Sequence, residues 1–282
     1  MKVGFNMLLW ATHIGEDRFD LFETLKKTGY DGVEIPIFEG DPSHFEKLGR
    51  AVRDAGLEAN GITVMPDAAR DAISSDAAAR KGALDHIAWA TDCTAAMGGT
   101  MLAGPLHQAL GRFSGEGRTP QEWDHGVETL RRAADRAAAA GIALSIEPLN
   151  RFECYFLNLV RDAAEFCKEV DRPNIGVLYD TFHANIEEKH PIGAIHQNIA
   201  SINHVHISAN DRGTPGKDHI PWAETFATLK RNGYDGWLTI EAFGRALPDL
   251  AAATRVWRDF FPDPEEVYTF GHDFIRNGWA AS

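Results

Sequence analysis

Residues 120–147 read PQEWDHGVETLRRAADRAAAAGIALSIE, and they contain one complete helix-to-strand unit. From Pro120 to Ala140 the apolar residues recur with helical spacing, and Gly141 suits the position that ends many helices. The apolar run Ala143–Ile146 is too short for a helix and fits a buried parallel strand, and Glu147 follows it directly. The stretch therefore predicts an α/β fold.

Short apolar runs of this kind recur along the chain, separated by segments with helical spacing. We predict eight strands, Val3–Leu9, Val33–Ile37, Leu57–Val64, Thr100–Ala103, Ala143–Ile146, Ile175–Tyr179, Ile202–Ile207 and Trp237–Ile240. We also predict helices at Phe19–Thr28, Pro42–Ala55, Asp76–Met97, Pro120–Ala140, Leu159–Val170 and Pro221–Asn232. Eight strands that alternate with helices are typical of a (β/α)8 barrel. An open, doubly wound sheet is the alternative, but no GxGxxG motif follows the first strand.

The 282-residue chain shows no linker-like cluster of proline or glycine, so we expect one barrel domain over residues 1–282. Glu187-Glu188-Lys189 is interpreted as the start of a solvated helix. We expect extra C-terminal helices after Pro248 that close the barrel or contact a second subunit. The large apolar residues of this tail are Trp257, Phe260, Phe261 and Trp279.

The charge and cysteine content limit the possible partners and compartments. A net charge of −13 repels phosphate backbones and anionic lipid, so we expect neither nucleic acid nor a membrane surface as a partner. Cys93, Cys154 and Cys167 form no CxxC pair and cannot all pair with one another, which indicates a reducing compartment. The N-terminus lacks the apolar core of a secretory signal, and the expected location is cytoplasmic.

Four polar residues directly follow or end the last four predicted strands: Glu147, Asp180, His206 and Glu241. The carboxyl ends of all strands meet at one face of a barrel, so these side chains are expected to converge. One carboxylate there could simply cap the next helix, but four at consecutive strand ends are harder to explain in that way. Three carboxylates and one imidazole favour Mn²⁺, Mg²⁺ or Co²⁺ over a structural zinc ion. We expect one such metal and no organic cofactor.

Several motifs surround these four residues in a distinctive order, and together they resemble the ketose 3-epimerases. This group contains D-tagatose 3-epimerase and D-psicose (D-allulose) 3-epimerase, within the xylose-isomerase-like barrels. The motifs are Glu147-Pro-Leu-Asn150-Arg151-Phe-Glu153, Asp180-Thr-Phe-His183, His206 followed by Arg212-Gly213, and Glu241-Ala-Phe243.

The resemblance implies a function for the site. Glu147, Asp180, His206 and Glu241 would hold the metal, with Mn²⁺ favoured. Glu147 and Glu241 would also remove and return the proton at C3 of a free ketose from opposite faces, through a metal-stabilised cis-enediolate. The substrate would belong to the D-tagatose, D-psicose, D-fructose or L-ribulose class, and the protein would be a homodimer or homotetramer.

The resemblance also implies substrate contacts. Residues that would bind the oxygens near C1 to C3 are Glu153, His183 and Arg212. Trp10 and Phe243 could form an apolar wall against the sugar. The chain also departs from the family pattern. Ala209 stands where a glutamate usually precedes the arginine, Ala184 stands where methionine is common, and the first-strand segment from Phe5 to Trp10 differs in detail.

Four further polar residues have simpler interpretations. For Glu34 we expect a helix cap or a salt bridge. His204 lies two residues before His206, on the same strand face, and is expected to be a hydrogen-bonded residue of the barrel interior. His107 and His13 lie in predicted βα loops, where they could touch the substrate, but we favour solvated loop histidines.

Other functions on this scaffold remain open. An aldose–ketose isomerase would use the same metal to move hydrogen between C1 and C2, and an epimerase could act on a 3-keto sugar derivative. A DNA-repair enzyme of the endonuclease IV type calls for more histidines and a basic face, which the charge of −13 disfavours. A non-catalytic sugar-binding protein would not require the complete set of ligands and acid/base residues.

Overall fold

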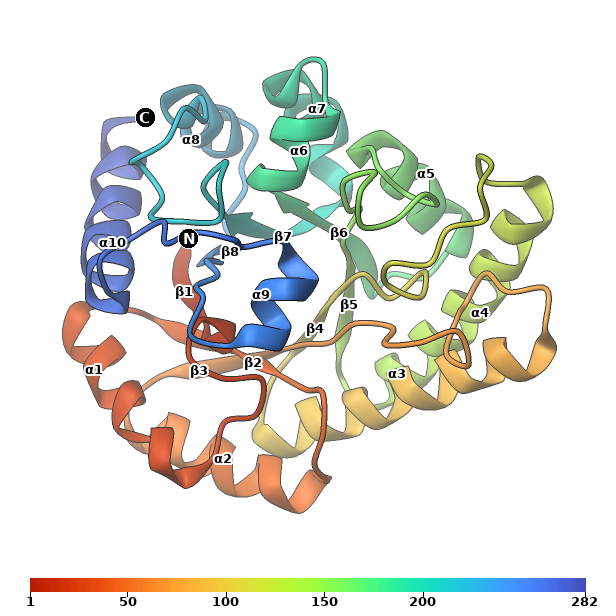
Figure 1. Cartoon of the computed structure of the whole chain (residues 1–282), viewed down its shortest axis with the longest axis horizontal. Coiled ribbons are helices and arrows are strands. Elements are labelled where there is room, and N and C mark those ends of the chain that lie inside the picture. Colours follow the sequence, from red (N-terminus) through yellow and green to blue (C-terminus); the bar gives the residue numbers. More distant parts are fainter.

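The computed structural model describes residues 1–282, and its eight parallel strands close into a barrel in chain order (Figure 1). The strands are β1 (Lys2–Asn6), β2 (Gly32–Pro36), β3 (Glu58–Ile62), β4 (Met101–Gly104), β5 (Ala143–Ile146), β6 (Ile175–Asp180), β7 (Ile202–Ile207) and β8 (Trp237–Ile240). Because β1 pairs with both β2 and β8, the sheet has no free edge. The predicted (β/α)8 barrel is confirmed.

Ten α-helices follow the strands, most of them around the outside of the barrel (Figure 1). They are α1 (Asp20–Thr28), α2 (Pro42–Asp54), α3 (Ala77–Met97), α4 (Pro120–Ala139), α5 (Val160–Val170), α6 (Thr181–Glu187), α7 (Pro191–Asn198), α8 (Trp222–Arg231), α9 (Pro248–Thr254) and α10 (Pro264–Ala281). Residues at the helix ends explain where the helices start and stop. Thr119 and Glu122 form a capping box before α4, and Gly98 ends α3 with a φ of 82°.

The first strand is shorter than predicted. Strand β1 ends at Asn6, and residues Met7–Leu9 form a short 3-10 turn. The Asn6 side chain accepts a hydrogen bond from the backbone N–H of Leu8 at 2.9 Å and so caps this turn. The chain therefore leaves the barrel wall before Trp10.

Two helices between β6 and β7 were not predicted. Asp180 caps α6 by accepting the backbone N–H of Phe182 at 2.6 Å. The interpretation of residues 187–189 as a helix start was wrong, because α6 ends at Glu187. The carboxylate of Glu187 is mostly buried and pairs with Arg151 at 3.0 Å, so it ties this helix end to the loop after β5.

The C-terminal tail forms two helices, as expected. Helix α10 contacts α8, α1 and β8, which makes it the helix that completes the outer ring. Helix α9 instead lies across the barrel mouth in Figure 1. A small apolar cluster joins it to the strand ends below: Leu8, Ile62, Phe243, Ala251 and Val256. No helix of the chain combines the length and apolar character needed to cross a membrane.

We predict that Gly49→Ala destabilises the fold, because α2 and α3 cross closely at this residue. A Cβ atom there would lie 2.1 Å from the carbonyl oxygen of Met97. Overpacking typically costs about 1–3 kcal/mol, which exceeds the gain of at most about 1 kcal/mol from helix propensity. Chemical denaturation should show a net loss of about 1–2 kcal/mol.

Gly193→Ala is the matched control. Gly193 also lies in a helix, but its added Cβ would meet only the Cβ of His190, at an ordinary 3.5 Å. We expect this variant to be neutral or slightly stabilised. Equal effects of the two substitutions would contradict the close crossing of α2 and α3.

Candidate metal centre and active site

The four strand-end residues meet at the mouth of the barrel. Glu147 follows β5, Asp180 ends β6, His206 lies in β7 and Glu241 follows β8. Parallel pairing sets Asp180 beside His206 in register, and every one of the four is buried. One ligand atom from each lies within 4.8 Å of the other three. The predicted convergence is confirmed.

The ring of His206 is oriented by hydrogen bonding. Its Nε2 atom lies 2.9 Å from the carboxylate of Glu34. Its Nδ1 atom faces Glu241 at 3.5 Å, Asp180 at 3.6 Å and Glu147 at 4.0 Å, yet it is buried with no hydrogen-bond partner. Buried polar atoms are normally paired, so a nitrogen aimed at three carboxylates indicates the position of a cation.

The charges around His206 support this reading. Although burial alone would lower it, the charges of Glu34 and Glu241 raise the pKa of His206 well above its usual value. The environment therefore demands a positive charge at Nδ1, as a proton or as a metal ion that displaces it. Three carboxylates with one imidazole are hard donors that suit a divalent cation, and the residues present fit such an ion.

The two glutamates differ in their environments. Burial raises the pKa of Glu147 well above its usual value, and the charge of Glu241 adds to this effect. For Glu241, burial acts in the same sense, but the positive charges of His206 and Arg212 outweigh it and lower the pKa. In the protein alone, the pKa values of the two glutamates are thus shifted in opposite directions.

Arg212 is the cation of the site. Its guanidinium donates to Glu241 at 2.5 Å and to Asp180 at 3.3 Å, and it lies 3.9 Å from the centre of the Phe182 ring. The backbone of Arg212 is left-handed, with a φ of 69°, and its carbonyl accepts the N–H of Phe243 at 2.9 Å. This loop conformation is strained for an arginine and is held by the contacts around it.

His183 is neutral and has a defined tautomer. Burial and the charge of Arg212 lower the pKa of His183 to about 3. Its Nδ1 atom accepts the backbone N–H of Asn150 at 2.9 Å, so the single ring proton is on Nε2. That nitrogen lies 3.0 Å from Arg212 Nη2 and 3.5 Å from Glu147, and because a guanidinium has no acceptor, the ring N–H can donate only toward the carboxylate.

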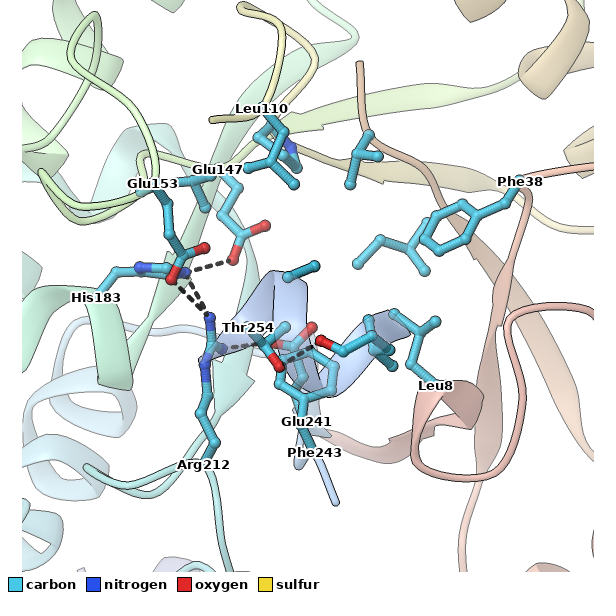
Figure 2. Close-up of a pocket in the computed structure, with 16 residues that line it drawn as sticks. Leu8, Phe38, Leu110, Glu147, Glu153, His183, Arg212, Glu241, Phe243 and Thr254 are labelled. Carbon is cyan, nitrogen blue, oxygen red and sulfur yellow. Dashed lines mark hydrogen bonds and ion pairs between the residues drawn. The ribbon is translucent and has the colours of Figure 1, made fainter. Parts of the chain in front are cut away.

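A pocket opens above these residues, with polar residues on one side and apolar residues on the other. Figure 2 shows Glu147, Glu153, His183 and Arg212 on one side, with Leu8 and Phe38 on the other. Glu153 lies 3.8 Å from Arg212, at the pocket edge. Most of the remaining lining is apolar: Ile62, Val64, Pro105, Leu110, Leu149, Phe243, Leu250 and Ala253.

The predicted sugar-contact residues divide into two groups. Glu153, His183, Arg212 and Phe243 line the pocket together. Trp10 does not, because the chain turns after β1 and its indole packs on Phe5 and Tyr268 with ring centres 4.9 and 6.1 Å away. Leu8 lines the pocket instead.

The structure also shows where the remaining histidines and Glu34 lie. His204 is a hydrogen-bonded residue of the barrel interior, as predicted, at 2.8 Å from Glu34. Glu34 caps no helix, but the alternative prediction of a salt bridge is confirmed: it lies within β2 and pairs with His204 and His206. The interpretation of His107 as solvated was wrong, because it is buried and donates to the carbonyl of Glu147 at 3.0 Å. His13 is partly exposed and stacks on His44.

Ala209, the departure from the family pattern, is buried under the site. Its carbonyl accepts the backbone N–H of Arg212 at 2.9 Å. The position therefore supports Arg212 through the backbone, which any residue can supply.

Comparison with known proteins agrees with this fold and site. The family model described as xylose isomerase-like TIM barrel matches residues 22–277, and the chain belongs to this family. Relatives that match over the full length identify a narrower group within this family. The chain is 31% identical over 281 residues to a ketose 3-epimerase of Arthrobacter globiformis, covering 98% of this chain and 96% of the relative. It is accordingly a carbohydrate epimerase of the ketose 3-epimerase family.

Two further similar proteins have names that specify a sugar. The chain is 30% identical over 252 residues to an L-ribulose 3-epimerase of Methylomonas, covering 89% of this chain and 87% of the relative. The crystal structure of D-psicose 3-epimerase with D-tagatose from Clostridium cellulolyticum H10 superposes with a TM-score of 0.91 at 28% identity, and 99% of each chain is covered.

Binding of Mn²⁺ should stabilise the fold, because the four ligands come from four strands. At a metal concentration of 100 times Kd, the linkage stabilisation is about 2.7 kcal/mol, or a rise in Tm of roughly 5–10 °C. Thermal unfolding with and without Mn²⁺ measures this shift. Asp180→Asn should reduce it, and Glu128→Gln, an exposed change on α4, should retain it. An unchanged Tm of the unmodified protein in millimolar Mn²⁺ would argue against the site.

Acidification should destabilise the protein partly through His107. Burial lowers the pKa of His107 to about 4, so its stabilising contribution is complete above the unfolded value of about 6.5 and is lost as pH falls toward 4. Between pH 8 and pH 5.5 this group should account for roughly 1 kcal/mol.

His107→Asn keeps a donor near the Glu147 carbonyl but cannot titrate. Denaturant unfolding in the presence of a chelator should therefore show a smaller loss of stability on acidification for this variant. An identical pH dependence in the two proteins would show that His107 does not titrate as a buried neutral group.

Proposed function

We propose that this protein epimerises C3 of a free ketose with the help of one divalent metal ion, and that Glu147 and Glu241 exchange the proton. The observation that carries the proposal is the placement of these two carboxylates. They follow β5 and β8, which have β6 and β7 between them, and they approach the pocket from different directions (Figure 2). Inverting a carbon without turning the substrate needs one such group on each face.

Both glutamates are also proposed metal ligands, and a carboxylate binds a metal in its ionised form. Each group would therefore hold the transferred proton only transiently, one removing it and the other returning it. For the reverse reaction the two residues exchange roles.

A carbon beside a ketone is a weak acid, so the charge that develops on the oxygen must be stabilised. When bound at Glu147, Asp180, His206 and Glu241, a divalent metal supplies Lewis-acid stabilisation of that charge. The convergent donors of His183 Nε2 and Arg212 Nη2 would bind the neighbouring sugar oxygens, with Glu153 accepting from a hydroxyl. These residues also fix the substrate in one orientation.

The pocket favours an unphosphorylated sugar. Arg212 is the single cation among the lining residues, and it is already bonded to Glu241 and Asp180. The other side of the pocket is apolar and offers nothing to a phosphate. We therefore propose a ketose of the D-tagatose, D-psicose, D-fructose or L-ribulose class, with Mn²⁺ as the favoured metal. Phe243 and Leu8 would contact its carbon chain.

Deuterium exchange distinguishes epimerisation from aldose–ketose isomerisation. With Mn²⁺ in D₂O, we expect NMR to show deuterium at C3 of both the recovered ketose and the product. Deuterium or hydrogen movement confined to C1 and C2 would support isomerisation instead. Exchange at a carbon beside the carbonyl of a 3-keto sugar, with none in free ketoses, would support an epimerase of 3-keto sugar derivatives.

Glu147→Gln and Glu241→Gln should each lower kcat by at least ~10³-fold, because each removes an acid/base group that contributes about 10²–10⁴-fold and also a metal ligand. Turnover is measured at saturating Mn²⁺, with Glu128→Gln as the exposed control of equal charge change. Near-normal turnover of either active-site variant would refute the two-base scheme.

We further propose that the protein forms a homodimer or homotetramer. Phe152 and Trp257 are large apolar residues that are 68% and 69% exposed. Light scattering coupled to size-exclusion chromatography would measure the mass, and a single 31.1 kDa species would contradict an oligomer.

A further inference from the structure

Beneath the metal centre lies a second buried cluster that the proposed reaction does not use. At its centre is Glu34, in the middle of β2 and 1% exposed. One carboxylate oxygen accepts from His206 Nε2 at 2.9 Å and from the side-chain amide of Asn6 at 3.0 Å. The other oxygen accepts from His204 Nε2 at 2.8 Å.

The geometry around Glu34 favours one arrangement of protons. The amide of Asn6 can only donate to Glu34, and two ring nitrogens face its oxygens at 2.8 and 2.9 Å, so an ionised carboxylate that accepts from all three satisfies every contact. A carboxylate only accepts hydrogen bonds, and therefore both histidines carry a proton on Nε2. For His206 this leaves Nδ1 as the atom that faces the metal ligands, 3.5–4.0 Å from their oxygens.

Asn6 connects this cluster to a proposed acid/base residue. Its amide nitrogen donates to Glu34 at 3.0 Å and also to Glu241 at 3.1 Å, while its carbonyl oxygen is held by the N–H of Leu8. The two amide hydrogens thus join β1 to the strands on either side of it. One oxygen of Glu241 is held by Asn6 and the other by Arg212.

We propose that Glu34 is a positioning residue, which fixes the tautomer of His206 and strengthens its Nδ1 as a metal ligand, and that Asn6 holds Glu241 in register with it. Carboxylates that accept from the far nitrogen of a metal-binding histidine commonly raise metal affinity by 10–100-fold. The inference rests on the metal site proposed above. It does not depend on which sugar is the substrate.

The first test uses the unmodified protein loaded with diamagnetic Mg²⁺. Long-range ¹H–¹⁵N NMR should show a slowly exchanging Nε2 proton on both His204 and His206, assigned with His204→Gln. A His206 ring with no proton on Nε2 would overturn the proposal. This measurement does not depend on whether any Glu34 variant folds.

The second test is Glu34→Gln. Its amide has one acceptor, and the donor of Asn6 biases that oxygen toward His206, so His204 should change its tautomer. The Mn²⁺ dissociation constant, measured by competition with a fluorescent chelator, should rise 10–100-fold because a neutral amide polarises His206 less.

Glu58→Gln is the matched control. It makes the same change on the neighbouring strand, but at the exposed opposite end of the barrel beside Lys2. We expect its Mn²⁺ affinity to equal that of the unmodified protein. A Glu34→Gln affinity within twofold of the unmodified protein would overturn the positioning role, whereas failure of the unmodified protein to bind Mn²⁺ would refute the proposed function itself.

Discussion

The ring of His206 lies between carboxylates on both sides, and the site depends on this arrangement. Glu34 receives one ring nitrogen, and Glu147, Asp180 and Glu241 surround the other. A neutral histidine can satisfy one side with its proton and must leave a lone pair on the other. A lone pair aimed at three carboxylates favours a cation among them, and the orientation of the ring would determine where that cation sits.

The barrel makes this concentration of charge possible. Parallel pairing sets the carboxyl ends of β5 to β8 side by side, so the backbone brings the ligands together at no further cost in chain entropy. Burying several carboxylates near one arginine is unfavourable by several kcal/mol per uncompensated ion. A bound divalent cation would offset that cost, and metal binding would then be coupled to folding stability.

The pocket above the metal centre has a polar side and an apolar side. Convergent donors from His183 and Arg212 suit the oxygens beside a carbonyl, where charge changes during proton transfer. The apolar cluster under α9 lies on the other side. The proposed proton-transfer groups and the apolar wall are thus on different sides of the pocket.

Much of this could be predicted from the sequence. Glu147, Asp180, His206 and Glu241 each follow or end a short apolar run, and strand ends in a barrel share one face. The bounds of β5, β7 and β8 were predicted to the residue. His107 was wrongly interpreted as solvated because its partner lies 40 residues away, and local patterns do not report which face of the barrel a side chain meets. Of the two roles predicted for Glu34, the salt bridge is found, with His204 and His206, and the helix cap is not. Trp10 was placed at the pocket because the apolar run hides the turn after Asn6.

Anomalous diffraction at the manganese edge, from crystals grown with Mn²⁺, tests the metal centre most directly. The peak should lie within ~2.0–2.4 Å of His206 Nδ1 and of one oxygen from each of Glu147, Asp180 and Glu241. A peak bound to His206 through Nε2, or one located away from these four residues, would contradict the assignment.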